Sequence, residues 1–414
     1  MKVKVNTRSL LWTQIYLLLI VRLISSLISF NPIVYLCDIV TIAIFVIQIK
    51  HGLPRQGVVL LFAIEFIYWV ISFTMGLSGS ISAFIELSRV LVRFYIIFTA
   101  AFRVFDEKDY RKIFDIFDII IVIHTALVFY QTYILHYTNG DMVGGLFGVT
   151  FGYGNTASHG LILIGTLVTV YKYFVCSDSV RKSAIKLVML FSVAMITEMK
   201  SFVFEAALIV ILFLVLDGRI KARTGLILAV IPVAGIVFLD YMINYFNFNI
   251  FDLDSINGYL NRGYGYNIDG VSRHDGYGKV FNRCFGGDWR LAIFGFGFAT
   301  SVSPFTETYF NNMNLGNFTY AKMFYDVGIV GSILYFAPFI ICIFKGVELR
   351  KYNKMIGAFC VILGILCVYL NFYGRVYLVN GWANSRNRFA SVITVRELNA
   401  DGTKAISDPV IVFD

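Results

Sequence analysis

The sequence is poor in charged residues, in proline and in cysteine. Charged side chains make up 15% of the 414 residues, whereas a soluble domain averages about 25%. The six prolines and six cysteines exclude a collagen-like chain and a disulfide-bonded scaffold. Because no Cys-x-x-Cys or His-x-x-x-His pair is present, we predict no metal site and no other cofactor.

Apolar side chains dominate instead. They make up 58% of the sequence, and aromatic residues make up 17%, which excludes a soluble enzyme and a disordered protein. A transmembrane helix needs about 20 mostly apolar residues. We therefore predict an all-α polytopic integral membrane protein with about eleven transmembrane helices, within a range of 10–12. The predicted spans are roughly Leu10–Ile28, Ile33–Ile49, Val58–Thr74, Ala83–Phe102, Ile113–His136, Gly160–Val175, Ile185–Thr197, Phe202–Leu216, Gly225–Met242, Tyr320–Phe344 and Met355–Leu370.

Lysine and arginine set the predicted orientation, because they concentrate in cytoplasmic loops. With the N-terminus in the cytoplasm, 20 of the 35 fall in inner segments, and the short outer loops carry only Lys200. Basic segments flank 185–216 on both sides, which favours a hairpin of two short spans over one long helix. No small-residue cleavage site follows the first span, so we predict an uncleaved helix. This topology explains most of the net charge of +9 without a nucleic-acid partner.

The longest non-membrane segment is 243–318, between the ninth and tenth predicted spans. Its 76 residues include eleven Gly and eleven Asn together with many aromatic residues. Connections of this length are usually functional or disordered, and aromatic content argues against disorder. Aromatic rings beside amides suit a sugar, or they form a lid at the membrane interface. We take 1–370 as one transmembrane domain that includes this extracytoplasmic loop, and 371–414 as a polar C-terminal tail.

The large loop also carries arginines, which are unusual on the outer side. They are either solvated surface residues or bidentate ligands of phosphate oxygens. Ser272-Arg-His-Asp275 fits a capping box and predicts a helix towards Phe281, with Arg273 and His274 in its first turn. Leu291–Phe298 is too short to span, so we expect it to dock onto the membrane domain as a re-entrant or interfacial piece. The four arginines are Arg262, Arg273, Arg283 and Arg290.

Three charged residues of the fourth span share one helical face. Glu86, Arg89 and Arg93 are spaced i, i+3, i+7. A charge near the bilayer centre costs about 2.5–3.5 kcal/mol on insertion scales, so such groups face a partner or a cavity. Two interpretations stay open: an ion pair of Glu86 with either arginine, or a cationic wall that holds a lipid-linked phosphate.

The other polar residues of the predicted spans differ in how well they suit a functional site. We expect His124 to be a packed, hydrogen-bonded histidine, whereas His159 at the outer mouth of span six is a better functional candidate. Glu205, one turn inside span eight, can turn towards the same cavity as Lys200. Pairing or snorkelling is expected to satisfy the remaining charges, which are Arg22, Glu65, Asp115 and Asp118.

Four motifs resemble the O-antigen polymerase and ligase superfamily of bacterial membrane proteins, over roughly residues 10–370. Gly144–Ser158, which includes Asn155, resembles a Gly/Asn-rich segment that leads into a mid-chain span. Thr197–Ser201 resembles a short outer turn, where the family often has Ser-Arg and this chain has Lys200. Val271-Ser-Arg273 followed by Leu291–Gly297 resembles the loop arginine and the later Gly-x-Gly. Phe318–Gly331 resembles the beginning of the span after the large loop.

The resemblance implies a GT-C-like glycosyltransferase fold in the bacterial cytoplasmic membrane. The donor would be a glycan on undecaprenyl diphosphate at the outer face, for O-antigen, capsule or exopolysaccharide synthesis. A polymerase passes the growing chain to the next lipid-linked repeat unit, whereas a ligase passes it to a lipid A core. Ligase relatives usually carry a His before the span that follows the loop. This chain has Asn317-Phe-Thr-Tyr320 there, which favours the polymerase. A chain-length regulator and a flippase of the pathway are the implied partners.

The expected chemistry needs cations for a diphosphate leaving group, because fixed arginines stabilise the charge that develops on it. Arg273 and Arg283 are the first choice for this role, and His274 or Asp275 is the candidate base for the acceptor hydroxyl. Further substrate contacts are predicted from Arg290, Lys200, Arg89, Arg93, Asn155 and His159.

Two rival classes stay open. A flippase or other transporter usually shows repeated halves and short loops, which are not visible here. A non-enzymatic membrane scaffold is the second rival. In the tail, Ser391–Leu398 and Thr403–Phe413 are predicted to form a small hairpin.

Overall fold

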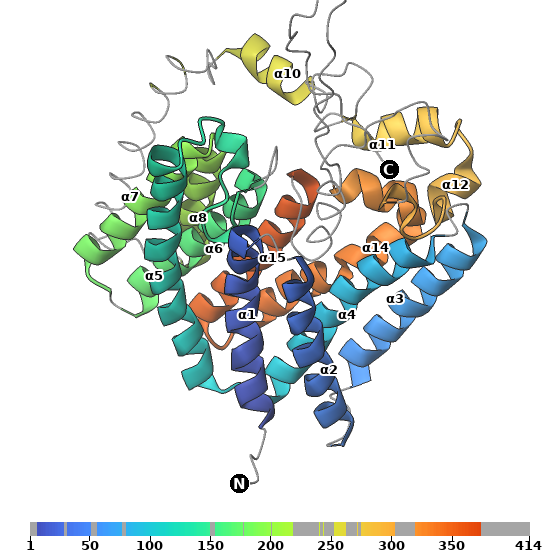
Figure 1. Cartoon of the computed structure of the whole chain (residues 1–414), viewed down its shortest axis with the longest axis horizontal. Helices are drawn as coiled ribbons and strands as arrows, with labels where there is room; N and C mark the ends of the chain where they lie inside the picture. Colours follow the sequence, from blue (N-terminus) through green and yellow to red (C-terminus); the bar gives the residue numbers. More distant parts are fainter. Residues whose placement is uncertain are drawn as a thin grey trace, which may run out of the picture.

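The computed structural model builds the described part of the chain from helices joined by short turns (Figure 1). Within it, extended backbone pairs only at an isolated bridge between Val143 and Val149. The structure describes residues 6–28, 31–50, 56–76, 80–149, 154–176, 178–199, 201–217, 252–261, 275–302 and 319–373, together with Asp240, Ile243 and Val271.

Helices occupy ten of the eleven segments that the sequence predicts to be spans, and the ninth, Gly225–Met242, lies almost wholly outside the described residues. The prediction of an all-α protein with apolar, membrane-length helices is confirmed for the described ranges, while the number of crossings stays a prediction. The ten helices are α1 (Thr7–Ile28), α2 (Tyr35–Lys50), α3 (Gln56–Met75), α4 (Ile81–Val104), α5 (Glu107–Phe129), α6 (Gly154–Val175), α7 (Val180–Ile196), α8 (Phe202–Asp217), α14 (Thr319–Leu349) and α15 (Lys354–Tyr373). Five described segments are long and apolar enough to cross a membrane: Thr7–Ser25, Pro32–Lys50, Lys108–Ile134, Ser158–Val175 and Thr319–Leu349.

The predicted hairpin in 185–216 is confirmed, because α7 and α8 are separate helices. Helix α7 ends in a Schellman motif, in which Met199 N donates to Ala194 O and Glu198 N donates to Met195 O. Glu198 takes the left-handed conformation (φ 57°) that a glycine usually supplies there. The chain therefore turns back sharply at the point where the basic flanking loops require it.

The two largest of five apolar clusters organise much of the described bundle. One lies among α5, α6, α7, α8 and α15 and includes Phe202, Ile162 and Leu366. The other joins α3, α4 and α14 to the large loop. Helices α14 and α15 pack against each other as an antiparallel pair and connect the two cores (Figure 1).

Helix α14 is broken at Gly328, whose φ of 64° and ψ of −163° are not helical. The break exposes backbone carbonyls that a continuous helix would satisfy internally. Phe296 N donates to Tyr325 O (2.9 Å) and Gly297 N to Asp326 O (2.8 Å), and the Tyr68 hydroxyl donates to Val327 O (2.8 Å). The large loop and α3 together complete the hydrogen bonding of this helix.

The described part of the large loop is folded and docked. It contains α10 (Leu253–Asn261), α11 (Gly276–Lys279) with a π-turn that continues it to Cys284, and α12 (Trp289–Phe294). These elements lie at the end of the bundle opposite the N-terminus (Figure 1). Phe298 stacks on Trp69 of α3 with ring centroids 5.0 Å apart. The predicted docking of Leu291–Phe298 onto the helical domain is confirmed.

The predicted capping box at Ser272 is wrong about where the helix begins. Helix α11 begins at Gly276 with Asp275 at the N-cap, and the Asp275 side chain makes no cap hydrogen bond. A tertiary contact fixes this position, since Gly276 N donates to the Tyr320 hydroxyl (3.2 Å). Arg273 and His274 therefore precede the first turn of α11.

Candidate functional site

Three of the predicted site residues, Arg273, His274 and Lys200, lie outside the described residues. Asp275, the other candidate base, forms an ion pair with Lys279 one turn later (2.9 Å). This local pairing gives Asp275 a role at the beginning of α11.

Arg283 and Arg290 are exposed on the large loop, in the π-turn and in α12. The Asp288 side chain caps α12 by accepting from Arg290 N (2.8 Å). Between them, burial raises the pKa of the Cys284 thiol to about 12, so this cysteine is not a nucleophile near neutral pH. The two arginines remain the cationic groups that this part of the loop presents to solvent.

Arg89 and Arg93 are brought together by an acid that the sequence interpretation missed. Arg89 Nη1 lies 3.1 Å from Asp38 Oδ2, and Arg93 Nη2 binds Asp38 Oδ1. Asp38 of α2 faces these arginines across the α2–α4 contact, and the expected pair with Glu86 stays a prediction. The guanidinium of Arg89 also lies over the Tyr35 ring, 4.8 Å from its centroid.

The two arginines and Asp38 form a cluster that is largely shielded from solvent. Two guanidinium groups share one carboxylate, and the three side chains are 9–17% exposed. Arg89 and Arg93 lie about 12 and 18 Å along α4 from Ile81, at 1.5 Å per residue. The sequence could have indicated Asp38 as a partner, because it is an acidic residue inside the second predicted span.

A second buried network joins His159, Glu205 and Tyr369. His159 Nε2 lies 2.5 Å from Glu205 Oε2, and the Tyr369 hydroxyl donates to Glu205 Oε1. The three residues come from α6, α8 and α15, so no local sequence pattern could join them. The sequence offers His159 and Glu205 only as separate candidates, so their pairing and the contact with Tyr369 were both missed.

Asn155 lies one turn before His159 and ties down the glycine-rich segment. Its Nδ2 donates to Asp141 Oδ1 (2.6 Å) and to Thr197 O (3.3 Å). The Glu198 carboxylate accepts from Gly140 N (3.3 Å). Side-chain amide and carboxylate groups therefore surround the outer end of α6.

His124 is the packed, hydrogen-bonded histidine that the sequence predicts. It is 1% exposed, its Nδ1 accepts from Leu146 N (3.2 Å), and its Nε2 lies 2.7 Å from Ser158 Oγ. Gln131 anchors the same segment through both atoms of its side-chain amide, which bond Gly145 N and Gly145 O. These contacts hold the 139–149 segment against α5.

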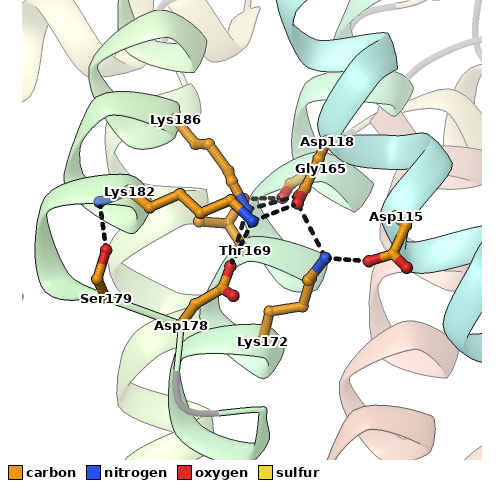
Figure 2. Close-up of polar contacts among 9 residues, drawn as sticks. All are labelled: Asp115, Asp118, Gly165, Thr169, Lys172, Asp178, Ser179, Lys182 and Lys186. Carbon is orange, nitrogen blue, oxygen red and sulfur yellow. Dashed lines mark hydrogen bonds and ion pairs between the residues drawn. The ribbon is translucent and has the colours of Figure 1, made fainter.

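Figure 2 shows a third polar network, between α5, α6 and α7 at the end nearer the N-terminus. Lys186 Nζ donates to Asp118 (2.6 Å) and Asp178 (3.1 Å), and Lys172 Nζ donates to Asp115 (2.6 Å) and Asp118 (2.9 Å). Lys182 adds a more exposed contact to Asp118 (3.3 Å). Three lysines face three aspartates, so this network is electrically balanced and structural.

The expected pairing of intramembrane charges is thus confirmed for Asp115 and Asp118. It is also confirmed for Glu65, which is 1% exposed and accepts from the Tyr95 hydroxyl. The side chain of Arg22 lies outside the described residues.

The described residues include no group of three or more His, Cys, Asp and Glu side chains arranged to hold a metal ion. They do offer cations, a histidine–carboxylate pair and hydrogen-bonding groups at one end of a helical bundle. Comparisons with protein-family models, with curated proteins and with solved structures give no significant match.

Proposed function

We propose that this protein is a membrane glycosyltransferase that polymerises oligosaccharide repeat units carried on undecaprenyl diphosphate. The proposal places it in the bacterial cytoplasmic membrane with about eleven spans, a GT-C-like fold, a cytoplasmic N-terminus and the large loop outside. The four motifs that resemble the polymerase and ligase superfamily support this assignment. So does the position of the folded loop at the end of the bundle opposite the N-terminus (Figure 1).

The observation that carries the proposal is the pair of little-exposed guanidinium groups, Arg89 and Arg93, that meet at Asp38 among apolar helices. Charged groups in such a place usually mark a binding site or an ion pathway. Guanidinium groups bind the oxygens of a diphosphate bidentately. The pair therefore fits a site for a lipid-linked diphosphate that enters between helices.

The same cations serve the chemistry of transfer. As the glycosidic bond breaks, negative charge builds up on the leaving diphosphate, and preorganised guanidinium groups stabilise that charge more than they stabilise the substrate. Arg283 and Arg290, exposed on the loop, are proposed to complete the cradle with Arg273 and Lys200. Asn155 is proposed to contact the sugars.

The test is a polymerisation assay with purified protein. The probe is the lipid-linked oligosaccharide fraction extracted from a strain in which this gene is deleted. We expect the wild-type protein to convert it into a ladder of longer chains without added lipid A core. Arg93→Gln should lower the rate about 100-fold, as the loss of one transition-state donor does.

Arg8→Gln is the matched control. Arg8 is also held by two aspartates, Asp106 and Asp109, but it lies at the N-terminal end of the bundle, so its loss should leave the rate within twofold. If the wild-type protein leaves the extracted units unchanged, the polymerase proposal is wrong. Growth that appears only after lipid A core is added would indicate a ligase instead.

A flippase is the alternative from another class, and the break in α14 at Gly328 is the observation that favours it, because transporters often bind substrate at discontinuous helices. Here, however, loop amides cap the carbonyls on one side of that break. In the deletion strain, single repeat units should accumulate at the outer leaflet. Accumulation at the inner leaflet would support the flippase and overturn the polymerase.

A further inference from the structure

His159, Glu205 and Tyr369 meet where three helices end on the side of the large loop. His159 lies in the second turn of α6, Glu205 in the first turn of α8, and Tyr369 in the last turn of α15. These helices pack against one another. The network therefore lies close to the predicted outer surface, where a lipid-linked sugar would be presented.

The hydrogen bonds fix which ring nitrogen of His159 faces the carboxylate. Both oxygens of Glu205 accept, one from Tyr369 and one from His159 Nε2, which is 2.5 Å away. A carboxylate accepts hydrogen bonds and cannot donate them, so Nε2 is the donor, and in the neutral imidazole Nδ1 keeps its lone pair. In that tautomer the imidazole can take a proton at Nδ1.

Glu205 and His159 differ in how much of each side chain is exposed to solvent. The Glu205 side chain is 5% exposed, whereas that of His159 is 16% exposed. A buried carboxylate costs several kcal/mol unless it is paired and hydrogen-bonded. The network thus keeps the acid away from water and leaves part of the histidine side chain accessible, an arrangement in which a carboxylate can orient a catalytic histidine.

Groups that recognise hydroxyls surround this histidine. Asn155 lies one helical turn before His159 on the same face of α6 and donates to Asp141. Glu198 is held nearby through Gly140 N, at the turn that precedes α8. Amides and carboxylates of this kind bind sugar hydroxyls, so the outer end of α6 suits the acceptor sugar.

We infer that His159 is the general base for the acceptor hydroxyl, with Glu205 as its positioning residue and Tyr369 holding Glu205. This inference rests on the proposed transferase function. As the acceptor oxygen forms its bond to the anomeric carbon, the bond from that carbon to the diphosphate oxygen breaks and its electron pair leaves with the diphosphate. The hydroxyl proton moves to His159 Nδ1, and the imidazolium then returns it to water.

The test uses the purified full-length protein and the same lipid-linked oligosaccharide extract. His159→Ala should lower kcat about 100-fold or more, the usual contribution of a general base, while KM changes less than about threefold. Free imidazole added to His159→Ala should restore part of kcat, because it can occupy the vacated space and accept the proton. A histidine that only supports the fold would show no such rescue.

Two further variants keep the inference testable if His159→Ala does not fold. Glu205→Gln has the same shape but no charge, so it should lower kcat about 100-fold because the imidazolium loses its partner. Tyr369→Phe should lower kcat up to tenfold with unchanged KM. His136→Asn is the control: this exposed histidine has a φ of 56°, which asparagine tolerates, and its kcat should stay unchanged.

The outcomes separate the two proposals. If the wild-type protein polymerises the extract while His159→Ala keeps more than a third of kcat, or Glu205→Gln keeps full kcat, the base assignment is overturned and the polymerase stands. If the wild-type protein itself forms no polymer, the proposed function fails first.

Discussion

At the scale of single residues, the buried charges form two kinds of cluster. Asp118 accepts from two lysines whose side chains are 6% exposed, Lys172 and Lys186. At Asp38, by contrast, two guanidinium groups of one helix converge on one carboxylate. We assign the lysine–aspartate network to stability, and we propose that the arginines bind an anionic substrate.

Asp118→Asn should destabilise the protein by about 3–5 kcal/mol, because it leaves buried lysines without their shared carboxylate. Lys182→Gln removes a neighbouring contact to the same aspartate, but that lysine side chain is 52% exposed, so its loss should cost less than about 1 kcal/mol. Unfolding of the purified protein in SDS, followed by circular dichroism, measures both. If the two variants lost the same free energy of unfolding, burial would not determine the strength of the contacts drawn in Figure 2.

Individual residue types were easier to predict than their partners. The apolar surroundings of Arg89, Arg93 and Glu205 mark them as groups that need a partner. The partners themselves, Asp38 and Tyr369, come from helices far away in the sequence. Helical spacing relates residues within one helix, so it pointed to Glu86 and could not find Asp38 on another helix.

At the scale of elements, docking of the loop onto the end of α3 depends on two glycines in contact, Gly297 and Gly76. A Cβ added at Gly297 would lie 2.5 Å from Gly76 Cα, and Gly297 has a φ of 119°. The segment from Gly295 to Ser301 is held further by Asp326, whose carboxylate accepts from Ser301 N (2.6 Å) and Ser301 Oγ (2.7 Å). Backbone contact at this distance is possible only for glycine.

Gly297→Ala should therefore release the loop from the bundle, since both the backbone conformation and the contact with Gly76 become unfavourable. We expect faster hydrogen exchange at the amides of Phe296 and Gly297 and faster proteolysis within 275–302. Gly286→Ala is the control, because Gly286 also has a positive φ (60°) but nothing lies within 4 Å of an added Cβ. Similar exchange in both variants would show that the close contact does not hold the loop.

The helices were the most predictable elements, because each apolar run is long enough to leave few alternatives. The beginning of α11 was not, because Gly276 is placed by the hydroxyl of Tyr320 and not by a local cap. Sequence patterns report local backbone preferences, and a contact across 44 residues can override them. The docking of Leu291–Phe298 was predictable because the segment is too short to span and too apolar for water.

At the scale of the whole molecule, the two ends of the bundle differ in what they carry. The N-terminus lies at one end, while the described loop helices lie at the other (Figure 1). Of the 35 lysines and arginines, 20 fall in the segments predicted to lie inside. This distribution predicts one orientation, with the N-terminus in the cytoplasm.

Cysteine labelling in intact cells tests that orientation. Asn282→Cys in the loop should react with a membrane-impermeant maleimide added outside. Tyr352→Cys, between α14 and α15 and 85% exposed, should react only after the cells are permeabilised. Each background needs the exposed native Cys176 replaced by Ser. The reverse pattern would invert the topology and remove the loop from the outer face.

The break in α14 at Gly328, where the loop and α3 donate hydrogen bonds to the carbonyls, has a consequence for the order in which the chain is assembled. Phe298 N bonds the Ser72 hydroxyl, 226 residues earlier in the sequence, and the same stretch of loop satisfies carbonyls of α14, which is synthesised after it. During synthesis α3 is available before the loop emerges, but α14 is not, so the loop cannot make its full set of contacts until α14 has been synthesised. Contacts between such distant residues form slowly. We therefore expect the contacts of the loop with α3 and α14 to form among the last steps of biogenesis.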